Sequence, residues 1–346
     1  MPRRSLTLLI AGLATLVAVG VSVFVSVPYV ILMPGPTLNT LGRDSSGKPL
    51  ITISGHRTYP TSGNLNMVTV SYQGNPPPRT GVNIFQALRA WLDPSEAVVP
   101  ATEIFPAGQT AQQTQQQDTA QMAGSQEQAT AAALSALHIQ YQTTVSVLSV
   151  NKGLPAYGVL KAGDVINSVN GSPVTGASSL TSLITSHPAG TVLHLVVQRG
   201  GQMVPVSVGT KEVSGRPVIG VAVQEGYKFP FAVRISVGDI GGPSAGMMFA
   251  LGIIDKLTPM NLTGGKFIAG TGEITASGQV EPIGGIQQKM VGARDAGATV
   301  FLTPVANCPD AVGAVPAGLR LVKVGTLSQA ISDLEALKAG KPVPSC

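Results

Sequence analysis

The 346-residue sequence predicts an α+β protein with a membrane-spanning helix at its N-terminus and two or three folded domains after it. Three observations indicate this class. One long apolar run lies within the first 35 residues, and short strand-like segments alternate with helix-like segments in the remainder. Only 11% of the residues are charged, against about 25% in an ordinary soluble domain.

The apolar run extends from Leu6 to Val27, and no charged residue occurs between Arg4 and Arg43. A helix over this run reaches about 33 Å, enough to cross the roughly 30 Å hydrocarbon core of a bilayer. Arg3 and Arg4 precede the run, so the positive-inside rule places the N-terminus in the cytoplasm and the C-terminal bulk outside it. A cleaved signal peptide and a buried core helix are the alternatives, but the run is long for a signal peptide and no clear cleavage site follows.

The sequence contains two cysteines, Cys308 and Cys346, and both lie in loop-like stretches next to prolines. In an oxidising compartment a disulfide between them would stabilise the fold by roughly 4 kcal/mol in the chain-entropy model. Two unpaired thiols are the alternative. The net charge of +5 is spread along the chain, so it predicts at most weak attraction to a membrane surface and no binding to nucleic acid.

Residues 36–124 are predicted to form an α/β segment. Apolar and polar residues alternate as in short strands in two stretches, Leu50 to Ile53 and Leu65 to Tyr72. Asn83 can cap a helix that ends before Pro94. Gln, Thr and Ala dominate from Gly108 to Gln128, and the early part of this stretch predicts a flexible loop. Met122 to Leu137 has the composition of a helix. Whether the strands complete the sheet of a later domain is left open.

Residues 125–212 are predicted to form a compact β-rich module. An apolar strand with Val145 and Val147 precedes the run Gly-Val-Leu-Lys-Ala-Gly-Asp-Val-Ile at 158–166, and a short helix and a closing hairpin follow. This order resembles a PDZ domain of the bacterial type. Because PDZ domains add an extended peptide as a strand, the resemblance implies peptide binding, with a structural spacer as the alternative. No clear Gly-Leu-Gly-Phe-like loop precedes Val145, so capture of a terminal carboxylate is not expected.

Residues 242–246 read Gly-Pro-Ser-Ala-Gly, which fits the Gly-x-Ser-x-Gly pattern of an activated serine. All four histidines precede Ser244, so the Ser, acid, His order of an α/β-hydrolase is absent. Because the proline has no N–H, an oxyanion hole must take its donors from Gly241, Gly242, Ser244 or Ala245. A Gly/Pro-rich turn that opens a buried helix is the alternative.

A buried lysine can replace the histidine as general base, because desolvation lowers its pKa. Six lysines follow Ser244, and two of them lie in the polar C-terminal tail. Lys289 differs from the others because it follows the Pro-Ile-Gly-Gly-Ile stretch and begins a helix that leads to the apolar strand at 299–302. An ordinary exposed lysine, with its stem along apolar surface, is the alternative.

The motifs around these residues resemble, in order, the proteolytic domain of Lon proteases. Gly-Pro-Ser-Ala-Gly is followed by Thr-Gly-Glu-Ile-Thr at 271–275, by Gly-Gln-Val-Glu-Pro-Ile-Gly-Gly at 278–285 and by Lys289. The resemblance implies that residues 213–346 form a Lon-type domain with a ribosomal S5 domain 2-like fold. It also implies that Ser244 is the nucleophile and Lys289 the general base, with no cofactor and no metal.

The resemblance assigns supporting roles as well. Thr271 falls where the family has a hydroxyl that helps to position the lysine, and Glu273 is a weaker candidate for local support. Gly241 and Gly242 belong to the serine loop, and Gly241 stands where many family members have an aspartate. No Gly-x-x-x-x-Gly-Lys-Ser/Thr phosphate loop occurs in the sequence, so the ATPase of cytoplasmic Lon is not expected.

Together these features resemble the membrane-anchored PDZ–Lon proteins of Gram-positive and actinobacterial type. The expected domains are a cytoplasmic tip and transmembrane anchor at 1–35, the α/β segment, the PDZ-like module and the Lon-type domain. The expected function is that of an ATP-independent serine endopeptidase that cleaves unfolded or extended extracytoplasmic or membrane proteins. The expected partners are those substrates and membrane lipid, and self-association is left open. A non-catalytic PDZ-type binding or scaffold protein at the cell surface is the alternative.

Overall fold

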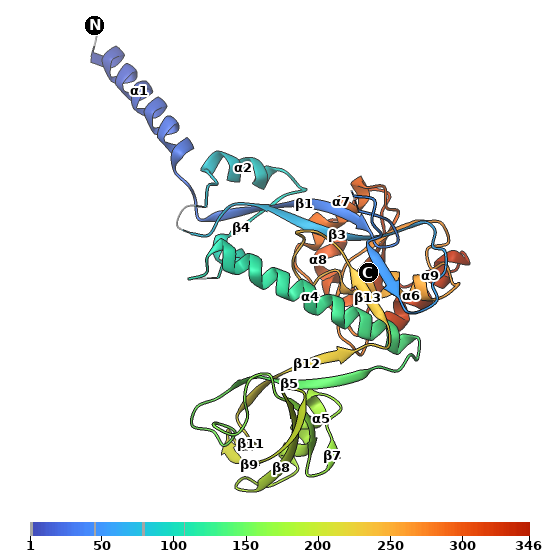
Figure 1. Cartoon of the computed structure of the whole chain (residues 1–346). Coiled ribbons are helices and arrows are strands. Elements are labelled where there is room, and N and C mark those ends of the chain that lie inside the picture. Colours follow the sequence, from blue (N-terminus) through green and yellow to red (C-terminus); the bar gives the residue numbers. More distant parts are fainter. Residues whose placement is uncertain (1–2, 45, 78–79, 107) are drawn as a thin grey trace. The chain divides into compact units, whose positions relative to one another are not determined.

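The computed structural model describes residues 3–44, 46–77, 80–106 and 108–346 and divides into two compact units (Figure 1). The first unit consists of Met1–His138 and Phe231–Cys346, and the second of Ile139–Pro230. The second unit is therefore an insertion in the sequence of the first.

The N-terminal helix α1 (Arg3–Phe24) covers most of the predicted membrane-spanning run. Its large apolar side chains are exposed wherever they are described, from Leu8 to Phe24. Among the described residues, no helix combines the length and the apolar character that a membrane crossing requires. The predicted transmembrane anchor is therefore not confirmed, and Met1 and Pro2 of the predicted cytoplasmic tip lie outside the described residues.

The core of the first unit is a mixed sheet with the strand order β18-β17-β14-β3-β1-β4. Strands β3, β14, β17 and β18 are parallel neighbours, whereas β1 runs antiparallel to β3 and β4. The bounds of the six strands are β1 Tyr29–Asn39, β3 Asn64–Gln73, β4 Ala97–Pro100, β14 Phe267–Gly270, β17 Val300–Pro304 and β18 Arg320–Val324. Strands from before and after the insertion thus form one sheet, which settles the question left open for residues 36–124.

Helices cover this sheet and position the C-terminal segment. Helix α6 (Gly246–Leu257) is apolar around almost its whole circumference and is nearly completely buried, as expected for a central helix. Helix α7 (Ile286–Asp295) packs on β1 and β3. The smaller elements of this unit are β2 Ile51–Ser54, α2 Ile84–Leu92, α3 Ala101–Ile104, β13 Ala232–Ile235, β15 Glu273–Ile274, β16 Val280–Glu281, η1 Val305–Asn307, α8 Cys308–Val312 and α9 Leu327–Lys338.

The two cysteines form a disulfide that ties the C-terminus to the first residue of α8. Cys308 and Cys346 are bonded, with their Cα atoms 5.3 Å apart. The structure therefore contains the pairing that the sequence favoured.

The Gln-rich stretch is a helix, and the expectation of a flexible loop there is wrong. Helix α4 (Ala111–Ala136) begins with a capping box, in which the Gln113 N–H donates to Thr110 Oγ1 at 3.2 Å and the Thr110 N–H to Gln113 Oε1 at 2.9 Å. Gln and Ala are good helix formers, so the composition supports the helix once it is capped. The C-terminal half of α4 is buried, and α4 packs on α6.

The second unit is a β-rich module with the strand order β12-β5-β6-β8-β9 and one helix against it in the described chain. The expected strand, helix and closing hairpin are all present. The elements are β5 Gln142–Val150, β6 Val165–Val169, β7 Ser172–Pro173, α5 Ala177–Thr185, β8 Val192–Arg199, β9 Gln202–Gly209, β10 Lys211–Val213, β11 Arg216–Val218 and β12 Val221–Lys228.

The limits of this unit differ from the predicted 125–212. Residues 125–136 belong to α4, whose buried side chains lie in the first unit. At the other end, β12 pairs with β5 along its length and completes the sheet. The sequence did not reveal β12 as part of the module because it follows the β10–β11 hairpin, after the β-rich pattern had already closed.

Candidate active site

Ser244 lies in the loop that leads into helix α6. Gly242 has a φ of +87°, a conformation that favours glycine, so a side chain there would strain the turn. The first turn of α6 carries no acidic residue, and its partial positive end therefore remains uncompensated beside Ser244. Ser244 is half-buried and lines a hollow of about 380 Å³, which Lys289 also lines.

Lys289 lies in the first turns of α7 and is only 4% exposed. Burial lowers the pKa of its amine from the ordinary value of 10.5 to about 7. In the described part of the chain, no carboxylate forms an ion pair with it. Because no negative charge compensates the buried cation, a large share of Lys289 is a neutral amine near pH 7.

Thr271 connects the lysine to the serine backbone. It follows β14 directly and is completely buried. Lys289 Nζ donates to Thr271 Oγ1 at 3.2 Å, and Thr271 Oγ1 donates to the Ser244 carbonyl at 2.9 Å. This is the position that the resemblance assigned to Thr271. Between described residues the lysine amine is hydrogen-bonded to the threonine and not to Ser244 Oγ.

Helix α4, which packs on α6, also holds the serine loop. The Gly242 N–H donates to the Asp118 carbonyl at 3.0 Å, and Ser125 Oγ donates to the Pro243 carbonyl at 2.8 Å. Because the Gly242 N–H is already bonded, it is not a free oxyanion donor. The candidate donors that remain are the N–H groups of Gly241, Ser244 and Ala245.

The closeness of α4 also explains the glycine at position 241. A Cβ on Gly241 would lie 2.6 Å from the Cβ of Asp118 and 3.2 Å from its backbone carbon. These contacts leave no room for the aspartate that many Lon-type domains have there. Asp118, from another part of the chain, occupies the neighbouring space.

Asp118 and Ser125 are site residues that the sequence reasoning missed. Both belong to α4, and Asp118 lies in the stretch that was expected to be a loop. The signal that could have revealed this helix is the Thr-x-x-Gln capping box at its start. Asp118 lines the hollow, and burial raises the pKa of its carboxyl. Burial, and after it the charge of Asp118, raises the pKa of Tyr72.

Glu273 lies on β15, opposite Glu281 of β16, and does not line the hollow. Burial and the charge of Glu281 raise the pKa of its carboxyl. Among the described residues no hydrogen bond or ion pair joins Glu273 to the serine or the lysine, so its suggested supporting role stays a prediction. Within the described ranges, no group of three or more His, Cys, Asp or Glu side chains could hold a metal ion.

Comparison with known proteins gives matches over both units. Residues 234–334 match the family model of the Lon protease (S16) C-terminal proteolytic domain. This part of the chain is similar to a Lon-type proteolytic domain. The match supports a serine peptidase. Residues 114–210 match the family model of the PDZ domain.

Several similar proteins are Lon proteases. The chain is 46% identical over 69 residues to Lon protease of Roseiflexus castenholzii, a match that covers 20% of this chain and 8% of that protein. It is 36% identical over 103 residues to Lon protease 2 of Thermus thermophilus, covering 29% of this chain and 12% of that protein. The match to Lon protease 1 of Bacillus subtilis is 27% identical over 177 residues and covers 49% of this chain and 22% of that protein. The chain thus spans only a small part of each relative's length.

Among solved structures, the PDZ domain of the SdrC-like protein from Listeria monocytogenes matches at a TM-score of 0.22 and 26% identity. That match covers 23% of this chain and 85% of the Listeria domain.

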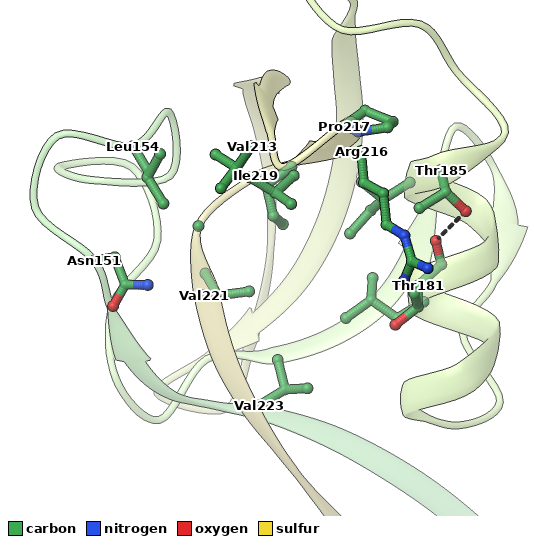
Figure 2. Close-up of a pocket in the computed structure, with 14 residues that line it drawn as sticks. Asn151, Leu154, Thr181, Thr185, Val213, Arg216, Pro217, Ile219, Val221 and Val223 are labelled. Atoms are coloured by element: carbon green, nitrogen blue, oxygen red, sulfur yellow. Dashed lines mark hydrogen bonds between the residues drawn. The ribbon is translucent and has the colours of Figure 1, made fainter.

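The second unit has a groove of its own beside helix α5 (Figure 2). It has a volume of about 400 Å³, and its floor is apolar, with Leu180 and Ile184 from α5 and Val221 and Val223 from β12. Arg216 of β11 reaches toward the threonines on α5, Thr181 and Thr185 (Figure 2). An edge strand next to an apolar groove can accept an extended peptide.

We expect Gly241→Ala to destabilise the first unit, because the new methyl group would meet Asp118 on a helix that is packed against α6. The expected loss is about 1–3 kcal/mol of unfolding free energy, the usual cost of overpacking. Urea unfolding of the full chain measures it. Gly313→Ala is the matched control, since a Cβ there meets nothing within 4 Å. Equal stability of both variants would contradict the proposed contact between the serine loop and α4.

We expect Lys289→Met to stabilise the protein, and to do so most at low pH. Lys289 is charged in both states below pH 7, so the folded protein then carries the full cost of burying the cation. Between pH 7 and 10.5 the folded lysine is neutral while the unfolded one is still charged, so the cost falls as pH rises. Urea unfolding of wild type and variant at pH 6 and pH 9.5 measures this cost. The gain in unfolding free energy from the substitution should fall by about 1.4 kcal/mol for each pH unit above 7. A gain that does not change with pH would contradict the buried, uncompensated amine.

Proposed function

We propose that this protein is an ATP-independent serine endopeptidase with a Ser244–Lys289 dyad. The observation that carries the proposal is a lysine with a pKa of about 7 in the hollow that the candidate nucleophile lines. A neutral amine can accept a proton from a hydroxyl at physiological pH, which an ordinary lysine cannot do. The Lon-type match over these residues supports the same roles.

In the proposed mechanism, Ser244 Oγ attacks the carbonyl carbon of the substrate peptide bond while its proton passes to the Lys289 amine. The tetrahedral intermediate collapses to an ester on Ser244, and the lysine returns the proton to the leaving amine of the substrate. A water molecule then attacks the ester, again with Lys289 as base, and releases the acid and the free serine. Thr271 accepts one N–H of Lys289 and so orients the amine, leaving its lone pair for the serine proton.

Negative charge on the substrate oxygen is stabilised at the start of α6. The candidate donors are the N–H groups of Gly241, Ser244 and Ala245, because the Gly242 N–H is bonded to the Asp118 carbonyl. The helix dipole of α6 adds to this stabilisation, since no carboxylate in its first turn opposes it.

The proposed substrates are unfolded or extended polypeptides. The sequence carries no phosphate loop that would belong to an unfolding ATPase. A hollow of about 380 Å³ admits a few side chains of an extended chain but not a folded domain. The groove on the second unit fits the same class of ligand, and the PDZ match supports this.

The proposed location is the cell membrane, with the N-terminus cytoplasmic and the bulk of the chain outside. The exposed apolar side chains of α1 and the lack of charge up to Arg43 support attachment through this segment. The Cys308–Cys346 disulfide supports an oxidising compartment.

A second candidate function is peptide binding without catalysis. The apolar groove beside α5 favours it, because such a groove would serve a scaffold protein equally well. The two candidates differ in whether the first unit breaks peptide bonds.

Cleavage of an unfolded protein by the full chain should depend on both dyad residues. We expect Ser244→Ala and Lys289→Ala each to lower kcat by at least about 10³-fold, because each removes a group that acts on the reacting atoms. Ser277→Ala and Lys341→Met, which change exposed side chains, are the controls and should leave the rate unchanged. Activity that survives both dyad substitutions would refute the mechanism, and an inactive wild-type protein that binds peptide would support the scaffold function.

The rate should rise with pH through the pKa of Lys289. Below pH 7 the lysine is protonated and cannot act as a base, so kcat/KM should fall about tenfold per pH unit. Above pH 8 the rate should level off. A profile measured with a short unfolded peptide tests this, and a flat profile between pH 5.5 and 8 would exclude Lys289 as the base.

The location can be tested by fractionating cells that express the full chain and a version with Leu9, Leu13 and Leu16 replaced by Asn. We expect the wild-type protein in the membrane fraction, digestible by protease added to spheroplasts, and the variant in the soluble fraction. The variant removes apolar surface from α1 without touching the catalytic residues. Wild-type protein found in the cytosolic fraction would refute the location.

A further inference from the structure

Helix α2 exposes an apolar face that the fold does not use. Five large side chains of this helix are exposed, at spacings that place them on one side of it. They are Ile84, Phe85, Leu88, Trp91 and Leu92, with exposed fractions of 38%, 44%, 47%, 74% and 76%. We call this set the α2 face. The opposite side of the helix already packs on the unit through the buried Ala87 and Ala90.

The amount of exposed apolar surface on α2 is unusual for a helix of nine residues. Contiguous apolar patches on a soluble surface mark sites of interaction with another molecule. Trp91 and Leu92 are among the most exposed large apolar side chains in the described chain. The described part of the first unit leaves these side chains exposed, so the α2 face is available for contact with another molecule.

The position of α2 indicates what covers it. The chain that leaves α1 is hydrogen-bonded to the two residues that precede α2: the Val27 N–H donates to the Val82 carbonyl at 2.8 Å, and a β-bridge joins Ser26 to Asn83. Thr80 Oγ1 also donates to the Val27 carbonyl. α1 and α2 are in contact, so α2 lies beside the end of α1 (Figure 1). The exposed apolar side chains of both helices thus gather at one end of the first unit.

The chemistry of the α2 face fits a bilayer surface. Trp, Phe and Leu are typical of helices that lie at the boundary between headgroups and acyl chains. Arg89 is the one charged residue within α2, and the acidic partner that it contacts at 2.8 Å, Glu96, follows the helix. An apolar face without acidic residues has no charge repulsion to overcome at an anionic surface.

We propose that α2 is a membrane-surface helix and that the α2 face lies in the headgroup boundary of a lipid bilayer. This rests on the membrane attachment in the proposed function and not on the catalytic dyad. Together with α1, such a helix would give the first unit two points of contact with the bilayer. Two contacts fix the tilt of a domain at the membrane, whereas one flexible attachment does not.

Trp91 makes a direct test available, because it is the single tryptophan of the sequence. The full chain is reconstituted with vesicles of phosphatidylcholine and phosphatidylglycerol, with and without lipids brominated near the headgroup end of the acyl chain. We expect the Trp91 emission to shift to shorter wavelength in vesicles and to be quenched by the bromine atoms. The reporter sits in the α2 face itself, so attachment through α1 alone does not produce this quenching.

Matched variants separate the α2 face from general loss of apolar surface. Leu88→Ser with Leu92→Ser should remove most of the quenching while Trp91 remains as reporter. Val312→Ser with Val315→Ser replaces two exposed apolar residues elsewhere in the same unit and should leave the quenching intact. Equal losses in both variants would overturn the proposal.

The other outcomes also decide the question. A chain that floats with the vesicles but shows no quenching of Trp91 would overturn the α2 inference and leave membrane attachment in place. A wavelength shift that grows with protein concentration, with no quenching by brominated lipid, would assign the face to a second copy of this chain and overturn the inference. A chain that does not float at all would overturn the attachment and the inference together, while cleavage of a soluble peptide would still report on the dyad.

Discussion

The buried amine of Lys289 is the constraint on which the rest of the first unit depends. A cation without a carboxylate partner is costly to bury, so its surroundings must be rigid and complete. Helix α7 provides these rigid surroundings by packing on β1 and β3. The packing is close: a Cβ added to Gly292 of α7 would lie 3.3 Å from the carbonyl oxygen of Gly35 on β1. Those two strands come from the N-terminal part of the chain, ahead of the insertion. The lysine is therefore held in place by residues more than 200 positions away, and the segment 234–334 alone lacks that wall of the site.

Much of the site could be predicted from the sequence, and the reasons are local. The Gly-Pro-Ser-Ala-Gly turn, the apolar helix after it and the Gly-Gly turn before Lys289 each have a clear pattern, and their order along the chain carried the resemblance to Lon-type domains. Asn83 predicted α2 because a capping residue followed by spaced apolar residues is a strong signal. The elements of the second unit were equally readable, since alternating apolar residues and an Asn-Gly turn define strands over short distances.

The remainder could not be predicted because it depends on contacts between distant segments. Helix α4 has few large apolar residues, so its periodicity is weak, and Gln-rich composition favoured a loop; the tertiary contact with α6 stabilises it instead. Asp118 and Ser125 became site residues only through that contact. The pairing of β3 with β14 is also long-range, and the sequence pattern of neither strand indicates which strand it pairs with. A short strand such as β12 is ambiguous for the same reason.

The bond between Gly242 and Asp118 has a consequence for how this chain could stabilise an oxyanion. In a serine loop with several free N–H groups, a substrate oxygen can bind to different sets of these groups. Here one of those groups is already bonded to α4, and the carbonyl of Pro243 is held by Ser125. The N–H groups of Gly241, Ser244 and Ala245 remain as candidate donors. The last two lie at the start of α6, which is buried, so its dipole acts through a medium of low dielectric. Helix α4 thus reduces the number of N–H groups that could bind the oxyanion, and among those that remain the dipole of α6 favours the ones at its own N-terminus.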